Sequence, residues 1–291
     1  MTDAKHTGAE AKVGTTGHEW DGITELNTPL PRWWLWLFYA TIVFAIGYWI
    51  VYPAWPLVFS YTNGVSDWHS RTAVAQELAA LQTQRSALTA KLAAASLQQI
   101  ETTPELLDFA RALGRPAFAD NCAPCHGAGG GGAKGYPNLD DNKWLWGGTL
   151  ADISQTITHG VRSGDDDGHQ GSMPAFGRDG TLKPDQISTV ADYVRSLDGL
   201  KTEPGADLAA GAKIFADNCA VCHGPQAKGN REVGAPNLTD NIWLYGPDKK
   251  TIVEDITNGR GGVMPAWGGK LSPVTIKALA VYVHTFGGGE Q

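Results

Sequence analysis

The sequence predicts a mainly α-helical protein in which a single N-terminal transmembrane helix is followed by two tandem domains of similar sequence. Three features predict this architecture: an uncharged apolar segment near the N-terminus, helical periodicity after it, and a repeat that fills the rest of the chain. The 291 residues are enough for two small globular domains and these additional segments. The formal net charge of −7 argues against nucleic-acid binding.

The apolar segment runs from Trp33 to Tyr52 without a charged residue. At about 1.5 Å per residue, a helix of this length spans about 30 Å, the thickness of a bilayer hydrocarbon core. Tryptophans and tyrosines stand at both ends, as expected at membrane interfaces, and Pro53 and Pro56 then end the helix. Because a mostly polar segment precedes it, we expect a retained membrane anchor rather than a cleaved signal peptide.

A helical connector is predicted to follow the anchor. Residues 66–100 carry apolar side chains at helical spacing, namely Val74, Leu78, Leu81, Leu88 and Leu92. This apolar side either docks on a partner subunit or packs on the protein's own domains. The predicted segments before the repeat are an N-terminal segment over 1–32, the transmembrane helix over 33–56 and the connector over 57–104.

The rest of the chain repeats itself. Phe118-Ala-Asp-Asn-Cys-Ala-Pro-Cys-His-Gly recurs as Phe215-Ala-Asp-Asn-Cys-Ala-Val-Cys-His-Gly, and Met173-Pro-Ala-Phe-Gly recurs as Met264-Pro-Ala-Trp-Gly. Each repeat closes with an amphipathic helix. We therefore predict two domains, over 105–200 and 201–291. Domains of this size have little core of their own, so a buried cofactor would supply the missing apolar centre.

All four cysteines fall in two Cys-x-x-Cys-His motifs. These motifs contain Cys122, Cys125 and His126 in the first repeat and Cys219, Cys222 and His223 in the second. In this motif the two thiols add to the vinyl groups of one haem, and the histidine becomes the proximal ligand of the iron. A zinc site would need four ligands, and a thioredoxin-like pair needs no histidine after its second cysteine. The sequence therefore predicts two covalently bound haem c groups.

Methionine is the predicted sixth ligand. Met173 and Met264 are the only methionines besides Met1, and they occupy equivalent places in the two repeats. Such a pair favours axial thioethers over core packing. Methionine and histidine together fill both axial positions of the iron, which suits electron transfer and leaves no site for oxygen. Each methionine ligates either the haem of its own repeat or the haem of the neighbouring repeat.

Other residues have secondary predicted roles. His169, in an insertion of the first repeat, is a minor alternative ligand, and Asp165 to Asp167 in the same insertion form a solvated turn rather than a calcium loop. Pro137 and Pro236 are expected to offer carbonyls to the proximal imidazoles. Four aromatic residues either line the haem crevices, bind propionates or pack in the core: Trp144, Trp146, Trp243 and Tyr245.

Each repeat resembles a class I cytochrome c domain, through Cys-x-x-Cys-His, the Pro-Asn-Leu loop and the Met-Pro-x-aromatic-Gly turn. The N-terminal run His18-Glu-Trp-Asp-Gly-Ile-Thr-Glu-Leu-Asn-Thr-Pro-Leu-Pro-Arg-Trp-Trp34 is more specific. Followed by one span and two haem motifs, it resembles the dihaem subunit, CcoP or FixP, of cbb(3)-type cytochrome c oxidases.

This resemblance implies a place in a respiratory complex. It implies a bacterial inner-membrane protein with its haem domains in the periplasm and its N-terminus in the cytoplasm. Electrons would come from a donor cytochrome c and pass to the other subunits of a cbb(3)-type oxidase and its oxygen-reducing core. Some members of that family carry a second span nearer the start, which this chain lacks. The resemblance covers essentially the whole chain.

The residues themselves argue that oxygen is reduced elsewhere. A haem-copper centre needs several spans that supply histidines, and the single span here has none. The chain is therefore predicted to be an electron-transfer subunit that is not catalytic alone. The alternatives are a cytochrome subunit of a periplasmic dehydrogenase, which the N-terminal run disfavours, and a free-standing tethered electron shuttle. A dihaem peroxidase would need an open sixth position, which the two matched methionines disfavour.

Overall fold

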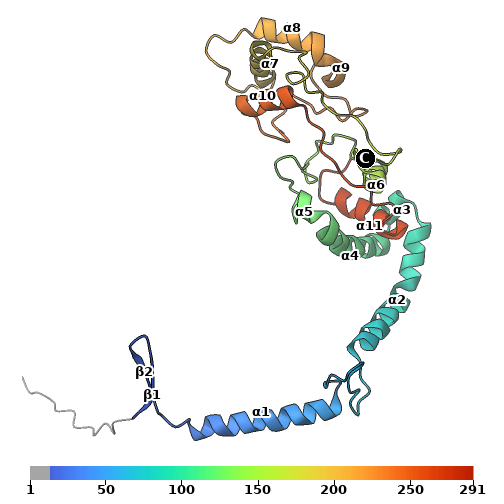
Figure 1. The fold of residues 1–291 in the computed structure, drawn as a ribbon. Coiled ribbons are helices and arrows are strands. Elements are labelled where there is room, and N and C mark those ends of the chain that lie inside the picture. The colour runs from blue at the N-terminus through green and yellow to red at the C-terminus, as the bar shows by residue number, and fades with distance from the viewer. Residues whose placement is uncertain (1–13, 291) are drawn as a thin grey trace, which may run out of the picture. The chain divides into compact units, whose positions relative to one another are not determined.

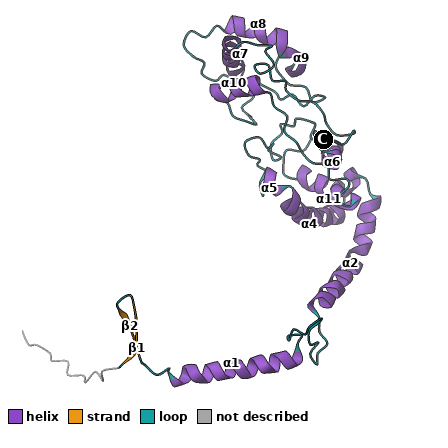
Figure 2. Cartoon of the chain, viewed as in Figure 1, coloured by secondary structure: helices purple, strands orange, loops and turns teal. Residues whose placement is uncertain are grey.

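The computed structural model describes residues 14–290, so residues 1–13 of the predicted N-terminal segment lie outside the described residues. The chain divides into two compact units that meet between Gln84 and Arg85. Regular structure is almost entirely helical (Figure 2). The predicted fold class, a mainly helical chain with one apolar N-terminal helix, is confirmed.

The first unit begins with a β-hairpin that the sequence analysis did not predict. Strands β1 (Thr15–Trp20) and β2 (Ile23–Leu26) pair antiparallel, with Trp20 opposite Ile23. Asp21 and Gly22 connect them with φ angles of 51° and 84°. Two-residue hairpin turns of this kind need positive φ at both positions, which explains the Asp-Gly sequence.

Helix α1 (Arg32–Val51) is the one helix among the described residues that is long and apolar enough to cross a membrane. None of its side chains is buried. The helix ends just before Pro53, as predicted, because proline disfavours a helical conformation at the residue before it; the predicted segment of 33–56 extends a few residues past this end. The prediction of a single apolar N-terminal helix therefore holds with a shorter C-terminal end.

The connector consists of two helices rather than one continuous helix. Helix α2 (Ser70–Ala94) is followed by α3 (Leu97–Thr102). The break occurs at Ser96, whose hydroxyl accepts a hydrogen bond from the backbone N–H of Gln99, while the backbone N–H of Ser96 donates one to the side-chain carbonyl of Gln99. Val74 and Leu78 are more than half exposed, whereas Leu92 is fully buried. The predicted apolar side of α2 is therefore covered only at its C-terminal end.

The second unit contains two groups of helices, each around its own core (Figure 1). The remaining helices are α4 (Pro104–Asn121), α5 (Ala123–His126), α6 (Leu150–His159), α7 (Pro184–Leu197), α8 (Leu208–Asn218), α9 (Ala220–His223), α10 (Lys249–Asn258) and α11 (Pro273–His284). One group contains α4, α6 and α11, and the other contains α7, α8 and α10.

The two groups exchange their last helices. Helix α11, which closes the second repeat, packs on α4 and α6 of the first repeat, and α7, which closes the first repeat, packs on α8 and α10 of the second. Phe118 of α4 contacts Tyr282 of α11, and Phe215 of α8 contacts Tyr193 of α7 in the same way. The domain ranges 105–200 and 201–291 therefore stay predictions, and helices from both ranges pack together in each group.

Glycine allows each helix pair to approach closely. A Cβ atom on Gly114 of α4 would lie 2.7 Å from the carbonyl oxygen of Ala278 and from Cβ of Tyr282, both in α11. At the equivalent crossing, a Cβ on Gly211 of α8 would lie 2.6 Å from Cβ of Tyr193 in α7. The exchanged packing thus depends on one glycine at each crossing.

We expect Gly114→Val to destabilise the second unit although valine favours a helix more than glycine does. Overpacking against backbone costs about 1–3 kcal/mol, and each kcal/mol lowers the unfolding midpoint of a unit of this size by about 2–4 °C. Thermal unfolding of the full chain in detergent measures the change. Gly129→Ala is the control, because no atom lies within 4 Å of the added Cβ. An unchanged midpoint for Gly114→Val would contradict the close α4–α11 contact.

Candidate haem sites

Both Cys-x-x-Cys-His motifs fold as a short helical turn directly after a longer helix. Cys122 ends α4, and the following turn, α5, carries Cys125 and His126. Cys219 ends α8 in the same way, and α9 carries Cys222 and His223. The turn therefore brings two sulfurs and one imidazole of each motif to one cavity.

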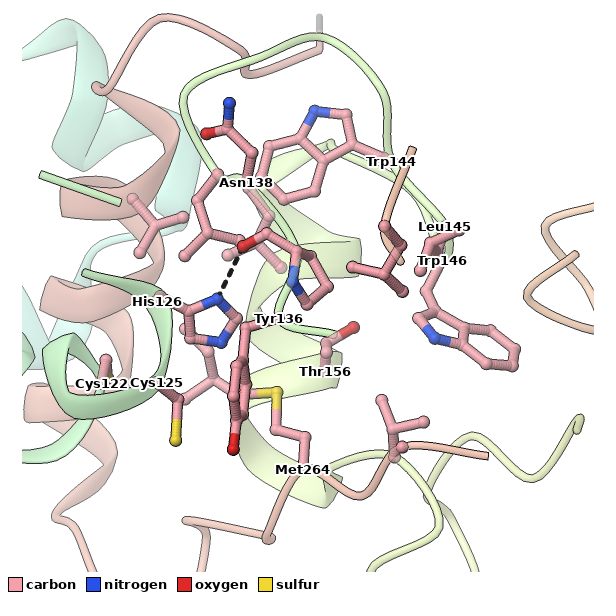
Figure 3. Close-up of a pocket in the computed structure, with 18 of the residues that line it drawn as sticks. Cys122, Cys125, His126, Tyr136, Asn138, Trp144, Leu145, Trp146, Thr156 and Met264 are labelled. Atoms are coloured by element: carbon pink, nitrogen blue, oxygen red, sulfur yellow. Dashed lines mark hydrogen bonds between the residues drawn. The ribbon is translucent and has the colours of Figure 1, made fainter. Parts of the chain in front are cut away.

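The first cavity has a volume of about 450 Å³ and is lined by Cys122, Cys125 and His126. Met264 of the second repeat reaches into the same cavity (Figure 3). Met173 of the first repeat does not line it. This volume falls in the usual range of ligand and cofactor sites.

The second cavity, of about 480 Å³, mirrors the first. It is lined by Cys219, Cys222 and His223 together with Met173 of the first repeat. Each candidate axial methionine therefore lies in the cavity of the other repeat, and this is the neighbour alternative that the sequence left open.

Backbone pairing holds each methionine in this exchanged position. Met264 and Val161 exchange two backbone hydrogen bonds of 2.9 Å. Met173 and Arg260 exchange two bonds of 2.8 and 3.1 Å. Gly160 and Gly259, just before these partners, have φ near +70° and lie so close to the methionine carbonyls that a Cβ would collide with them.

The proximal histidines are oriented by carbonyl groups. Nδ1 of His126 lies 2.9 Å from the carbonyl oxygen of Pro137, and Nδ1 of His223 lies 3.0 Å from that of Pro236, which confirms the predicted contacts. Since a carbonyl only accepts, Nδ1 carries the proton and Nε2 keeps its lone pair for a metal. Burial lowers the pKa of His223, which also favours the neutral, ligating imidazole.

The first cysteine of each motif is uncharged in the protein without haem. Burial, with a smaller effect of the neighbouring cysteine, raises the pKa of Cys122 and of Cys219 to about 11. A cavity with two thiols, a neutral imidazole and a thioether fits a covalently attached haem c.

The tryptophan side chains differ in what they contact. Nε1 of Trp144 donates to the carbonyl of Gly288 at 2.6 Å, and Nε1 of Trp243 donates to the carboxylate of Asp198 at 2.8 Å. These two indoles already have protein partners, so the predicted alternative of propionate binding does not apply to them. Both line a cavity wall instead.

The insertion of the first repeat does not contribute a ligand to either cavity. His169 lines neither cavity, its Nε2 lies 3.0 Å from Oγ1 of Thr156, and its ring stacks on Trp146 with centroids 4.3 Å apart. A backbone hydrogen bond from Asp167 lowers the pKa of the Asp165 carboxyl group, and pairing with His159 at 3.1 Å lowers it further.

The two cavities share a wall. Six residues line both: Leu145, Trp146, Arg162, Leu244, Tyr245 and Gly262. Of these residues, Trp146 and Tyr245 were predicted to lie near the haems, whereas Arg162 was not. Val161 and Arg260 occupy equivalent places in the two repeats, because each pairs with a methionine. The next residues, Arg162 and Gly261, are therefore also equivalent, and the second repeat has no arginine that would have drawn attention to Arg162.

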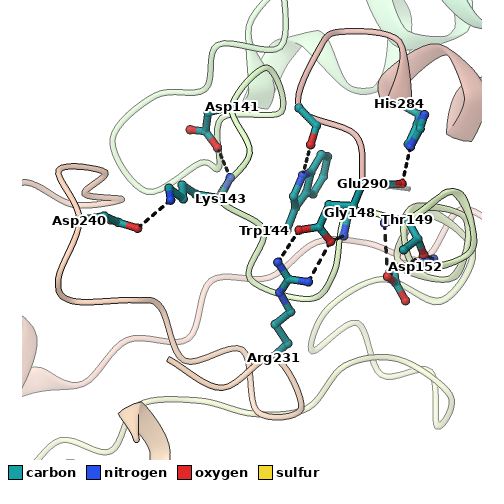
Figure 4. A network of polar contacts seen from close by, with 11 residues as sticks. Asp141, Lys143, Trp144, Gly148, Thr149, Asp152, Arg231, Asp240, His284 and Glu290 are labelled. Carbon is teal, nitrogen blue, oxygen red and sulfur yellow. Dashed lines mark hydrogen bonds and ion pairs between the residues drawn. The ribbon is translucent and has the colours of Figure 1, made fainter. Parts of the chain in front are cut away.

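The segment after α11 forms hydrogen bonds with residues beside the first cavity and an ion pair with Arg231 of the second repeat (Figure 4). The guanidinium of Arg231 donates to both oxygens of Glu290, at 2.8 and 2.5 Å, and the backbone N–H of Gly148 donates to the same carboxylate at 3.0 Å. Gly288 accepts from Trp144 in this segment. The network therefore braces a tryptophan of the first cavity.

This network predicts a pH-dependent contribution to stability. Arg231 holds the pKa of Glu290 below its ordinary value of 4.5, so the contribution is present above that value and is lost as the pH falls through the lower folded-state pKa. At about neutral pH, we expect Glu290→Gln to cost at most about 1 kcal/mol, because Arg231 is half exposed. Thermal unfolding of both proteins at several pH values measures this; a difference that stays constant down to acid pH would contradict it.

Comparisons with known proteins agree with this geometry. Residues 12–58 match the family model "N-terminal domain of cytochrome oxidase-cbb3, FixP", residues 112–198 match "Cytochrome c", and residues 206–283 match "Cytochrome C oxidase, cbb3-type, subunit III". Haem c binding follows from the two cytochrome c domains.

Several whole-length relatives are similar to the chain. The cbb3-type cytochrome c oxidase subunit FixP of Azorhizobium caulinodans is 68% identical over 278 residues, covering 95% of this chain and 94% of the relative. FixP of Bradyrhizobium sp. strain ORS 278 is 62% identical over 290 residues, with both chains covered completely. The subunit CcoP of Azospirillum brasilense is 52% identical over 294 residues, covering 98% of this chain and 99% of the relative.

Proposed function

Because this chain belongs to the FixP and CcoP family of cbb(3)-type cytochrome c oxidase subunits, we propose that it carries electrons through two haem c groups to the oxygen-reducing core of such an oxidase. One observation supports this most: two adjacent cavities each combine a Cys-x-x-Cys-His motif with a methionine and share one wall. Haem contributes the one-electron chemistry when it is bound.

In this proposal Cys122 and Cys125 attach the first haem covalently, and His126 and Met264 are its axial ligands. The pairing of Met264 with Val161 supports this assignment, since it holds the thioether in the first cavity. The tautomer of His126 that Pro137 selects presents the correct nitrogen to the iron.

The second site is built in the same way from Cys219 and Cys222 as attachment points and His223 and Met173 as axial ligands. Met173 is held by Arg260, and the His223 imidazole by the carbonyl of Pro236. With both axial positions taken at both sites, neither haem offers a position for oxygen or peroxide.

The proposed place of the protein is the bacterial inner membrane. Helix α1 supports a single membrane span. The proposed orientation, with the haem domains in the periplasm and the N-terminus in the cytoplasm, follows from the family resemblance. A donor cytochrome c would reduce the haems, and the other subunits of the cbb(3)-type oxidase would receive the electrons. The match of residues 12–58 to an N-terminal domain of this oxidase favours that assembly over a dehydrogenase subunit or a free-standing shuttle.

Purification from native membranes in mild detergent tests the proposal. We expect b-type haem, copper and cyanide-sensitive oxygen uptake with reduced cytochrome c to co-purify with the protein, together with two covalent haems per chain. Co-purification of a dehydrogenase, or of c-type haem alone, would contradict the assignment to an oxidase.

A further inference from the structure

The side chain of Arg162 connects the two methionine-bearing loops. Its Nε lies 2.7 Å from the carbonyl oxygen of Gly262, and its Nη1 donates to the carbonyl of Gly171. Gly262 lies two residues before Met264, and Gly171 lies two residues before Met173. One guanidinium thus holds the backbone beside both candidate axial ligands.

Arg162 also differs from the other charged residues at the cavities. Among the described residues, Lys134 and Lys143 line only the first cavity and Arg260 and Asp255 only the second, whereas Arg162 lines both. Its positive charge therefore lies at the wall that the two sites share.

Arg162 has no carboxylate partner among the described residues of the protein. Within residues 14–290, no carboxylate makes an ion pair with its guanidinium, and both hydrogen-bond partners are neutral carbonyls. Arg260, at the second cavity, is different because its Nε donates to Asp255 at 2.6 Å and its guanidinium lies 4.4 Å from the centre of the Tyr245 ring. The field of Arg162 is therefore less compensated than that of Arg260.

We propose that Arg162 is a positioning residue shared by the two haems: it clamps both methionine loops across the repeats and places between the sites one positive charge that has no carboxylate partner within the protein. The inference depends on the proposed function, because it assumes a haem in each cavity. Reduction removes one positive charge from a haem iron, so a nearby cation stabilises the reduced state and raises the reduction potential. Partial burial strengthens this interaction, since water screens it less.

The expected effect is a coupled change at both haems. In Arg162→Gln, the charge is lost and the glutamine cannot reach both carbonyls as the guanidinium fork does. We expect both reduction potentials to fall, with the reduced-to-oxidised ratio of each haem at fixed potential changing on the order of tenfold, which corresponds to about 59 mV for one electron. Arg162→Lys keeps the charge but loses the fork, so the potentials should fall less while methionine ligation weakens.

The experiment is a spectroscopic redox titration of the purified full-length protein. The absorption band of methionine-ligated ferric haem reports whether both loops still hold their thioethers, and covalent haem content reports folding. Arg111→Gln is the matched control, because it removes the same charge from an exposed position on α4 that lines neither cavity. Arg260→Gln should affect the second haem only.

Two unchanged potentials in Arg162→Gln, or a shift at one haem only, would overturn the proposal if both haems and their methionine bands are retained. If Arg162→Gln loses haem, Arg162→Lys decides: unchanged methionine bands and wild-type potentials in that variant would refute the clamp. Failure of the proposed function looks different, because the wild-type protein itself would then lack two methionine-ligated haems or would not purify with an oxidase.

Discussion

Replacing Cys122 and Cys125 together by serine is expected to remove the first haem and halve the covalent haem per chain. Serine forms no thioether, so only axial ligation would hold the porphyrin. The first cavity would also lose its apolar centre, which a domain of this size needs for stability. Electron transfer to oxygen should be lost as well, if electrons pass through both haems in series.

Haem staining after denaturing electrophoresis measures this prediction, since only covalently attached haem survives. Oxygen uptake of the intact complex with a reduced donor cytochrome c measures the consequence for function. The matched variant replaces Cys219 and Cys222 and should also keep half of the stain. Full staining in either variant would show that its motif does not attach a haem.

The sequence predicted those parts of the fold that depend on local patterns. The apolar run that forms α1 and the two Cys-x-x-Cys-His turns each need only a short segment to be recognised. The end of α1 just before Pro53 was predicted from that proline, whereas the break at Ser96 was not predicted although a capping box marks it. The carbonyl contacts of Pro137 and Pro236 were predicted correctly because both repeats carry the same loop.

The hairpin in the first unit was missed although its signal is present. Asp21-Gly22 is a strong two-residue turn sequence, and Trp20 and Ile23 on either side pair as its register requires. The same residues belong to the N-terminal run that carries the family resemblance.

The exchange of helices and methionines could not be predicted, for a physical reason. Both repeats close with an amphipathic helix, and Gly114 and Gly211 allow the same close approach at the two crossings. Periodicity identifies which face of a helix is buried but not which copy of a matching helix covers it. Which helix packs on which copy depends on how the chain connects elements that are far apart in the sequence.

Because each methionine lies in the cavity of the other repeat, replacing one should change the reduction potential of the other repeat's haem. Histidine in place of an axial methionine lowers the reduction potential of the haem that it ligates. Met264 lines the same cavity as His126, so Met264→His should lower the potential of the haem in the first cavity although the residue belongs to the second repeat. Met173→His should lower that of the haem in the second cavity.

A single-haem background identifies which haem responds. In protein that carries Cys219→Ser and Cys222→Ser, only the haem of the first motif remains covalently bound, and its potential can be titrated alone. Adding Met264→His should lower this potential strongly, whereas adding Met173→His should leave it unchanged. The reverse result would mean that each methionine ligates the haem of its own repeat and that the exchanged assignment is wrong. An unchanged potential in both variants would remove both methionines from the ligand set.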